Sequence, residues 1–177
     1  MKQITSYSVL FLLVLISCNN QKQESKPEGD STKTSREQKI LENTKTHYEA
    51  WNKIDTNLMK TVTIEKITRY ANGKLASSDQ TGLAATMNYF KTAIPDFTLT
   101  TGDLIINDNK SYTKWVVKGT NTGMFGKNSP TGKSSETNGF TILTFNDEGK
   151  VTQEEAYFDQ LSYLEAWGYT VTPPKTK

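Results

Sequence analysis

The sequence predicts an α+β protein in which helices pack on one curved antiparallel sheet. Apolar residues in the first half recur at three- and four-residue steps, which is the spacing of a buried helix face. The second half is rich in β-branched and aromatic residues, and turn sequences containing Asn, Asp and Gly divide it into strands. Helices followed by a meander of long strands are typical of this class.

The helices are expected first. The apolar face of the first helix holds Ile40, Thr44, His47, Tyr48, Trp51 and Ile54. Asp55 provides an N-cap for a short second helix, and Asp79 caps a third that must end near Pro95. Residues 61–70 have the composition of a strand, and Asn72-Gly73 is a strong signal for a tight turn.

The strands follow, and a helix closes the sheet. Long strands are expected at residues 97–106, 112–121, 134–145 and 151–158. A final helix at 160–167 is expected to cover one end of the sheet. The sequence therefore predicts one folded domain over residues 37–169, with a tail at 170–177.

The N-terminus has the features of an export signal. Lys2 precedes a short apolar run that is too short to span a bilayer, and the run ends at Leu15-Ile16-Ser17-Cys18. Leu-Ile-Ser-Cys resembles the lipobox of bacterial lipoproteins, in which the cysteine is lipidated and becomes the new N-terminus. Residues 1–17 are then a signal peptide. The alternative is an ordinary secretory signal with an incidental cysteine.

A lipidated Cys18 predicts a protein of the bacterial cell envelope. Residues 18–36 would comprise the lipidated cysteine and a disordered tether, since 19–36 contain no aliphatic or aromatic side chain. Two or more acyl chains hold a protein on a membrane surface. Asn19 stands where some lipoproteins have the aspartate that retains them at the inner membrane, so an outer membrane is favoured. Cys18 is the chain's only cysteine, which excludes an internal disulfide.

The charge distribution argues against a nucleic-acid surface. The chain has a formal net charge of +2, and the excess lies entirely within the first 36 residues, so residues 37–177 are neutral overall. Nucleic-acid binding needs a basic patch on the folded domain itself. The sequence also contains no Cys/His cluster for zinc, P-loop, dinucleotide-binding glycine pattern or Gly-x-Ser-x-Gly elbow.

Three short motifs in the second half of the sequence form one pattern. They are Ile94-Pro95-Asp96-Phe97, then the segment 119–126 with Pro130-Thr131-Gly132-Lys133, then Gly149-Lys150-Val151 leading to Tyr157-Phe158-Asp159. Their order and spacing resemble the SnoaL-like polyketide cyclases, or ester cyclases, of the NTF2-like superfamily. The resemblance spans residues 40–168. It implies a cone-shaped barrel with a deep, mostly apolar pocket and, in the enzymes, acid–base chemistry on a carbon acid without a metal or cofactor.

Asp159 matches the family's catalytic acid/base. Such a carboxylate would remove a proton alpha to a carbonyl and return one to the new alkoxide. If the last strand continues through Asp159, side-chain alternation places Val151, Gln153, Glu155, Tyr157 and Asp159 on one face. The alternative is that Asp159 N-caps the helix that begins at Gln160, and the two roles are not exclusive.

Three positions depart from the family pattern. Asn121 stands where many ester cyclases have a histidine, and an amide can hydrogen-bond a substrate oxygen but cannot shuttle a proton. Glu155 stands where a pocket-lining tryptophan is common, and Gln153 replaces a common glutamate. Glu155 is interpreted as a specificity contact or as a residue at the pocket mouth.

Further ligand-binding candidates surround the expected pocket. His47 could line it and partner Asp159, because the first helix lines the pocket in folds of this type; the alternative is a hydrogen-bonded core histidine. Met124 and Phe125, in a Gly-rich loop, are candidates for a hydrophobic lid. The remaining candidates are aromatic: Trp51, Trp115, Phe140 and Tyr157.

Three functions remain open at this point. The first is an envelope enzyme of the ester-cyclase type that acts on a small apolar carbonyl compound through Asp159. The second is a non-catalytic binder of a lipid or hydrophobic metabolite. The third is a homodimeric assembly module, because NTF2-like folds often dimerise through the open face of the sheet. Asn121 in place of histidine favours binding, and the retained Asp159 favours catalysis.

Overall fold

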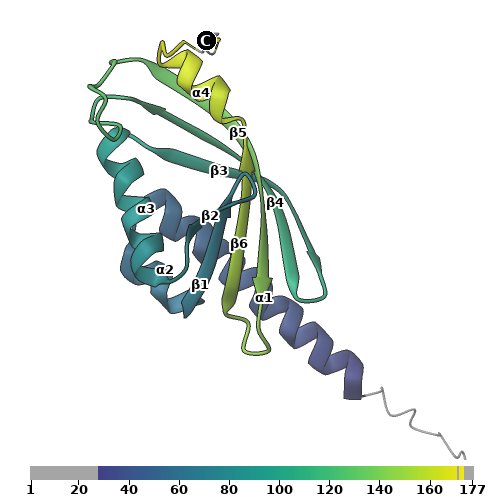
Figure 1. Cartoon of the computed structure of the whole chain (residues 1–177). Helices are drawn as coiled ribbons and strands as arrows, with labels where there is room; N and C mark the ends of the chain where they lie inside the picture. The colour runs from purple at the N-terminus through teal and green to yellow at the C-terminus, as the bar shows by residue number, and fades with distance from the viewer. Residues whose placement is uncertain (1–27, 171, 174–177) are drawn as a thin grey trace, which may run out of the picture.

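The computed structural model describes residues 28–170 and 172–173 (Figure 1). The predicted signal peptide, the lipidation site Cys18 and the first part of the predicted tether lie outside the described residues. The helices are α1 (Glu28–Lys53), α2 (Thr56–Val62), α3 (Gln80–Ala93) and α4 (Gln160–Ala166). The strands are β1 (Thr63–Ala71), β2 (Lys74–Ser77), β3 (Thr98–Asn107), β4 (Lys110–Thr120), β5 (Ser134–Phe145) and β6 (Val151–Phe158).

All of these strands form one curved sheet in the order β2-β1-β6-β5-β4-β3. Figure 1 shows α1, α2 and α3 on one side of the sheet and α4 at one end of it. The predicted α+β class is confirmed, but the sheet is mixed because β1 pairs with β6 in parallel. Strands β3, β4, β5 and β6 pair antiparallel in succession, and these pairings set the direction in which β6 runs.

Helix α1 begins at Glu28, within the segment for which the sequence predicts a disordered tether. Composition alone suggested no order there, because these residues have no apolar surface to bury. A helix that is already formed grows at little cost, however, since each added residue gains one backbone hydrogen bond. The packed part of α1, which begins near Ile40, supplies that formed helix.

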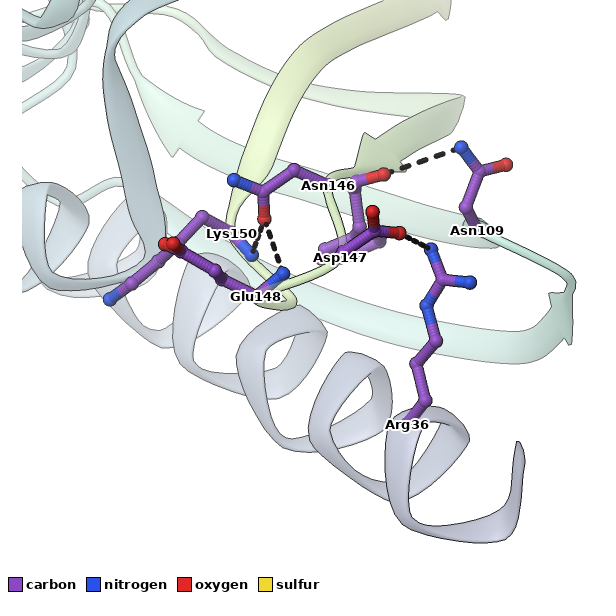
Figure 2. Close-up of polar contacts among 7 residues, drawn as sticks. Arg36, Asn109, Asn146, Asp147, Glu148 and Lys150 are labelled. Carbon is purple, nitrogen blue, oxygen red and sulfur yellow. Dashed lines mark hydrogen bonds and ion pairs between the residues drawn. The ribbon is translucent and has the colours of Figure 1, made fainter. Parts of the chain in front are cut away.

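Hydrogen bonds within the β5–β6 turn hold its shape, and an ion pair joins it to α1 (Figure 2). Asn146 Oδ1 accepts hydrogen bonds from the backbone N–H groups of Glu148 at 3.1 Å and Lys150 at 2.9 Å. Arg36 Nη2, on α1, donates to Asp147 Oδ1 at 3.0 Å. The predicted turn is thus present, and its closure fixes where β6 begins relative to β5.

An irregularity at the start of β6 changes which side chains face inward. Phe145 pairs with Val151, whereas the preceding residue Thr144 pairs with Gln153, so β6 holds one extra residue at this point. Such a β-bulge reverses the alternation beyond it. Val151 is buried before the bulge, and Glu154 is buried after it.

The core lies between the sheet and the helices. Its main cluster includes Ile40, Trp51, Ile67, Leu83, Met87, Leu143 and Phe145. A second cluster of Ala93, Ile94, Tyr163 and Trp167 joins the end of α3 to α4. Helix α4 therefore closes the open end of the layered structure, as the sequence predicts, and a cavity remains between the two clusters.

Candidate functional site

The cavity is lined by α1, α3, α4 and the inner face of the sheet. Its volume is about 80 Å³, several times the roughly 10–15 Å³ that one water molecule needs. The wall is mostly aromatic and aliphatic, and its largest side chains are Trp51, Phe90, Phe97, Trp115, Phe158, Tyr163 and Trp167. A mostly apolar cavity with a few polar groups is the usual form of a small-molecule site.

One ion pair lies in the cavity wall. Arg69 of β1 and Glu154 of β6 are 5% and 3% exposed, and both line the cavity. Arg69 Nε donates to Glu154 Oε1 at 3.1 Å, and the guanidinium carbon lies 5.3 Å from the centroid of the Trp51 ring. The two residues are register partners in the parallel β1–β6 pair. Two opposite charges are therefore buried together, which removes most of the cost of burying either alone.

His47 lies next to Glu154 but outside the cavity wall. Its side chain is fully buried, and its Nε2 is 3.6 Å from Glu154 Oε2. Burial lowers the pKa of His47 below its ordinary value of 6.5; the Glu154 carboxylate opposes this shift and the Arg69 guanidinium adds to it. His47 is thus neutral near pH 7. It does not line the cavity, and its position is that of the core-histidine alternative.

Hydroxyl groups extend the polar part of the wall. Trp115 Nε1 donates to Thr141 Oγ1 at 2.8 Å, and both residues line the cavity. The hydroxyl of Tyr48 adjoins those of Thr113 and Thr141, and burial raises the pKa of Tyr48 well above its ordinary value. Tyr48 of α1 and Thr141 of β5 therefore add hydroxyl groups to the cavity wall.

Gly139 determines how Trp115 lies in the wall. Gly139 pairs with Trp115 across β4 and β5. A Cβ atom at Gly139 would stand 2.1 Å from the indole ring, closer than any real contact. The absence of a side chain at Gly139 therefore lets the indole lie flat across β5, where it reaches Thr141 and contacts Phe158 at 6.1 Å between ring centroids.

The predicted ligand-binding residues divide between the cavity and other places. Trp51 and Trp115 line the cavity as expected. Asp159 does not: it is exposed, and its Oδ1 accepts a hydrogen bond from Ser162 N at 3.0 Å. This is the helix-cap alternative for Asp159, at the start of α4. The position therefore gives no support to a role for Asp159 in the cavity.

Glu155, Tyr157 and Phe140 lie on the outer face of the sheet, so their predicted place in the pocket is wrong. The bulge in β6 is the reason for the first two, because it turns residues 153, 155 and 157 outward. Glu155 accepts hydrogen bonds there from Gln153 and Tyr157, and Tyr157 is 41% exposed. Phe140 stacks on Tyr112 with 6.3 Å between ring centroids.

The Gly-rich loop after β4 also differs from its prediction. Asn121 is fully buried and holds the loop together: its amide nitrogen donates to Ala93 O and Gly123 O, and its Oδ1 accepts from Thr131 N. Phe125 packs on Trp167 at 5.3 Å between centroids, outside the cavity wall. Met124 is 45% exposed and does not line the cavity either. The loop supports α4 from behind and does not form a lid.

The main residues that the sequence analysis missed are Glu154 and Arg69. A signal for Glu154 was present, because Glu154, Ala156 and Phe158 alternate with the more polar Gln153, Glu155 and Tyr157. This alternation alone indicates which side of β6 faces the core. Arg69 had no such signal, since its partner lies 85 residues away and only the parallel strand pairing brings the two together.

A curved sheet, helices on its inner side and a mostly apolar cavity between them make this an α+β protein with a candidate small-molecule site. The sequence profile of the SnoaL-like polyketide cyclase family matches residues 43–166, which is most of the chain. The protein therefore belongs to the SnoaL-like polyketide cyclase family, within the NTF2-like fold.

Solved structures agree with this assignment. A protein from Jannaschia sp. CCS1, described as a proposed SnoaL-like polyketide cyclase, has a TM-score of 0.70 at 15% identity and covers 86% of this chain and 99% of its own. IdmH of Streptomyces antibioticus, a proposed polyketide cyclase, has a TM-score of 0.64 at 19% identity, with 73% and 99% covered. AclR of Streptomyces galilaeus, a proposed hydroxylase, has a TM-score of 0.65 at 22% identity, with 81% and 91% covered. These likenesses show the fold. No curated protein sequence matches the chain.

No group of three or more His, Cys, Asp or Glu side chains within the described part of the chain is placed to hold a metal ion. Among the same residues, none of the helices combines the length and apolar character needed to cross a bilayer.

Proposed function

We propose that the protein binds a small, mostly apolar molecule in the cavity between the sheet and α1, α3 and α4. The observation that supports this is the cavity itself, in which an aromatic wall meets a single buried ion pair, Arg69–Glu154. A buried ion pair adds little to stability compared with apolar residues of the same size. Its place in a cavity wall is better explained by recognition of a polar group on a ligand.

Catalysis of the acid–base type is the second candidate. One observation favours it: Glu154 lines the cavity, and its Oε2, which lies 3.6 Å from His47 Nε2, has no hydrogen-bond partner among the described residues. Asp159, the acid/base that the family resemblance implies, caps α4 outside the cavity wall. Binding is nevertheless preferred, because Arg69 occupies the other oxygen of Glu154 and its neighbour His47 is neutral and enclosed.

A cavity-filling variant tests the binding function. Ala156 lines the cavity, so Ala156→Leu should fill part of it, whereas Ala85→Leu adds the same atoms on the exposed face of α3. A panel of small apolar compounds would be screened by thermal shift and native mass spectrometry. We expect at least one compound to stabilise the native chain and Ala85→Leu but not Ala156→Leu. Equal stabilisation of both variants would place binding outside the cavity.

We further propose that Cys18 is lipidated and holds the protein on an envelope membrane, the outer membrane in preference to the inner. The support is the Leu-Ile-Ser-Cys sequence after a short apolar run. Labelled palmitate fed to expressing bacteria should enter the native chain but not Cys18→Ser, and membrane fractions should contain only the native chain. Labelling of Cys18→Ser at the native level would contradict this proposal.

A homodimer through the outer face of the sheet is also proposed. That face exposes Ile105 and Tyr157, which are 62% and 41% accessible, beside the stacked pair Tyr112 and Phe140. Exposed apolar groups gathered on one face are typical of a protein contact. Sedimentation should show a dimer that Ile105→Lys disrupts, with Leu161→Lys on α4 as the matched exposed control. A monomer at every concentration would contradict it.

A further inference from the structure

The polar atoms around the cavity do not satisfy one another. Glu154 Oε2 lies 3.6 Å from His47 Nε2, and the Tyr48 hydroxyl adjoins those of Thr113 and Thr141. Both atoms are buried, and neither has a hydrogen-bond partner of good geometry among the described residues. Both residues line the cavity. Buried carboxylate and hydroxyl oxygens are nearly always hydrogen-bonded in native proteins, so two such groups in one cavity wall indicate the place of a ligand's polar group.

The charges near Glu154 Oε2 and the Tyr48 hydroxyl already cancel. Arg69 and Glu154 form the pair at 3.1 Å, and His47, the other titratable group against Glu154, is neutral because burial lowers its pKa. An anionic or cationic ligand would bring a charge with no counter-charge into a mostly apolar cavity, which is costly. The ligand that fits is therefore electrically neutral.

The chemistry of the two oxygens defines the group further. A carboxylate oxygen can only accept a hydrogen bond, so Glu154 Oε2 needs a donor. A carbonyl, ester or ether has none to give. A hydroxyl can donate to Glu154 and at the same time accept from the Tyr48 phenol, and it adds no charge.

We infer that the ligand is a neutral ring alcohol or phenol whose hydroxyl donates to Glu154 Oε2 beside the Tyr48 hydroxyl. This inference rests on the proposed binding function and names the chemical class of its ligand. The ring of the ligand packs among Trp51, Trp115 and Trp167, all of which line the cavity. A polar contact at one end and aromatic packing at the other give the ligand a single orientation.

The chain itself provides the signal for the test. It has three tryptophans, and all three line the cavity, so their fluorescence reports an occupied cavity directly. The probes are cyclohexanol, methylcyclohexane and cyclohexanecarboxylate, which place a hydroxyl, a methyl or a carboxylate on the same ring. The full chain with Cys18→Ala is titrated, since a lipidated chain would need detergent, and detergent would compete for an apolar cavity.

The variants separate recognition of the hydroxyl from recognition of the ring. Glu154→Gln removes the charge of the acceptor, and Tyr48→Phe removes the neighbouring hydroxyl. Glu155→Gln is the matched control, because Glu155 lies on the outer face of the same strand. We expect Glu154→Gln to lower the affinity for cyclohexanol relative to methylcyclohexane by about tenfold, as for loss of a charge-assisted hydrogen bond. Tyr48→Phe should lower it by about threefold, and Glu155→Gln should not change it.

Each other outcome has a definite meaning. If none of the probes changes the fluorescence, the proposed binding function and the inference fall together. If cyclohexanol and methylcyclohexane bind but their ratio is the same in every variant, the cavity stands as an apolar site and the hydroxyl inference is overturned. Tightest binding of cyclohexanecarboxylate would overturn it too, in favour of an anion at Arg69. If Glu154→Gln does not fold, the ratio in Tyr48→Phe decides.

Discussion

Glu154 and Glu155 are neighbours in β6, yet their environments are opposite. Glu154 is 3% exposed, faces the cavity and is paired with Arg69. Glu155 faces outward, where Gln153 and Tyr157 donate hydrogen bonds to its two oxygens. The same type of side chain is therefore part of a buried site at one position and part of the outer surface at the next.

The β-bulge near Val151 decides which glutamate is which. Without the extra residue in β6, the alternation that starts from buried Val151 would turn Glu155 inward and Glu154 outward. A shift of one residue in the pairing register of β6 would therefore exchange the positions of Glu154 and Glu155. Glycine at 149 and the hydrogen bonds of Asn146 close the turn that precedes the bulge (Figure 2).

The largest expected effect comes from breaking the inner pair. Glu154→Ala leaves the Arg69 guanidinium buried without a counter-charge, and we expect it to lower the free energy of unfolding by about 3–5 kcal/mol. Chemical denaturation of the chain measures this. Glu155→Ala, at the outward-facing position, should change it by no more than about 0.5 kcal/mol.

A double variant sharpens the same comparison. Arg69→Met with Glu154→Met removes both charges at similar volume, so it should be much more stable than the sum of the single variants predicts. A reversed order, in which Glu155→Ala costs more than Glu154→Ala, would show that β6 has the other register in solution.

The next effect concerns the inner face of β5. Gly139→Ala places a methyl group 2.1 Å from the Trp115 ring, which must then move out of the cavity wall. We expect a loss of about 1–3 kcal/mol in stability, as for overpacking, and a shift in tryptophan fluorescence. Asn138→Ala, one residue away on the exposed side, is the control. Unchanged fluorescence in Gly139→Ala would mean that Trp115 does not lie across Gly139.

The sequence predicted the scaffold better than the site, and the reason is physical. Hydrophobic periodicity and turn chemistry are local, so the α+β class, the strands after Pro95 and the turn at Asn146 could be predicted. The site depends on long-range register: Arg69 meets Glu154 across a parallel pairing, and the bulge turns Glu155 away. A bulge has no reliable signal in one sequence.

His47 provides a third comparison, between the folded and unfolded chain. Its pKa is lowered by burial in the folded protein, so the unfolded chain binds more protons as the pH falls below about 6.5. Stability should therefore be fully present above pH 6.5 and decline as the pH falls toward the lower folded pKa. His47 is the only histidine, so its ring signal in NMR spectra gives the pKa without assignment.

A matched variant isolates this group. In His47→Gln the part of the pH dependence between pH 6.5 and the folded pKa should disappear, while the acid unfolding caused by carboxylates at lower pH remains. A His47 signal that titrates at or above 6.5 would contradict the neutral, buried imidazole and with it the charge balance of the cavity.

The smallest expected effect tests where the site ends. Asp159 follows β6 directly and caps α4, so Asp159→Ala should cost about 1 kcal/mol, whereas Asp159→Asn, an equally good cap, should cost almost nothing. Cyclohexanol titration of Asp159→Asn then separates the two roles of Asp159. Unchanged binding places Asp159 outside the site, as its exposure and its bond to Ser162 N indicate. Lost binding at unchanged stability would extend the site past the end of β6, and the contrast between an inner and an outer face of this strand would no longer define the cavity.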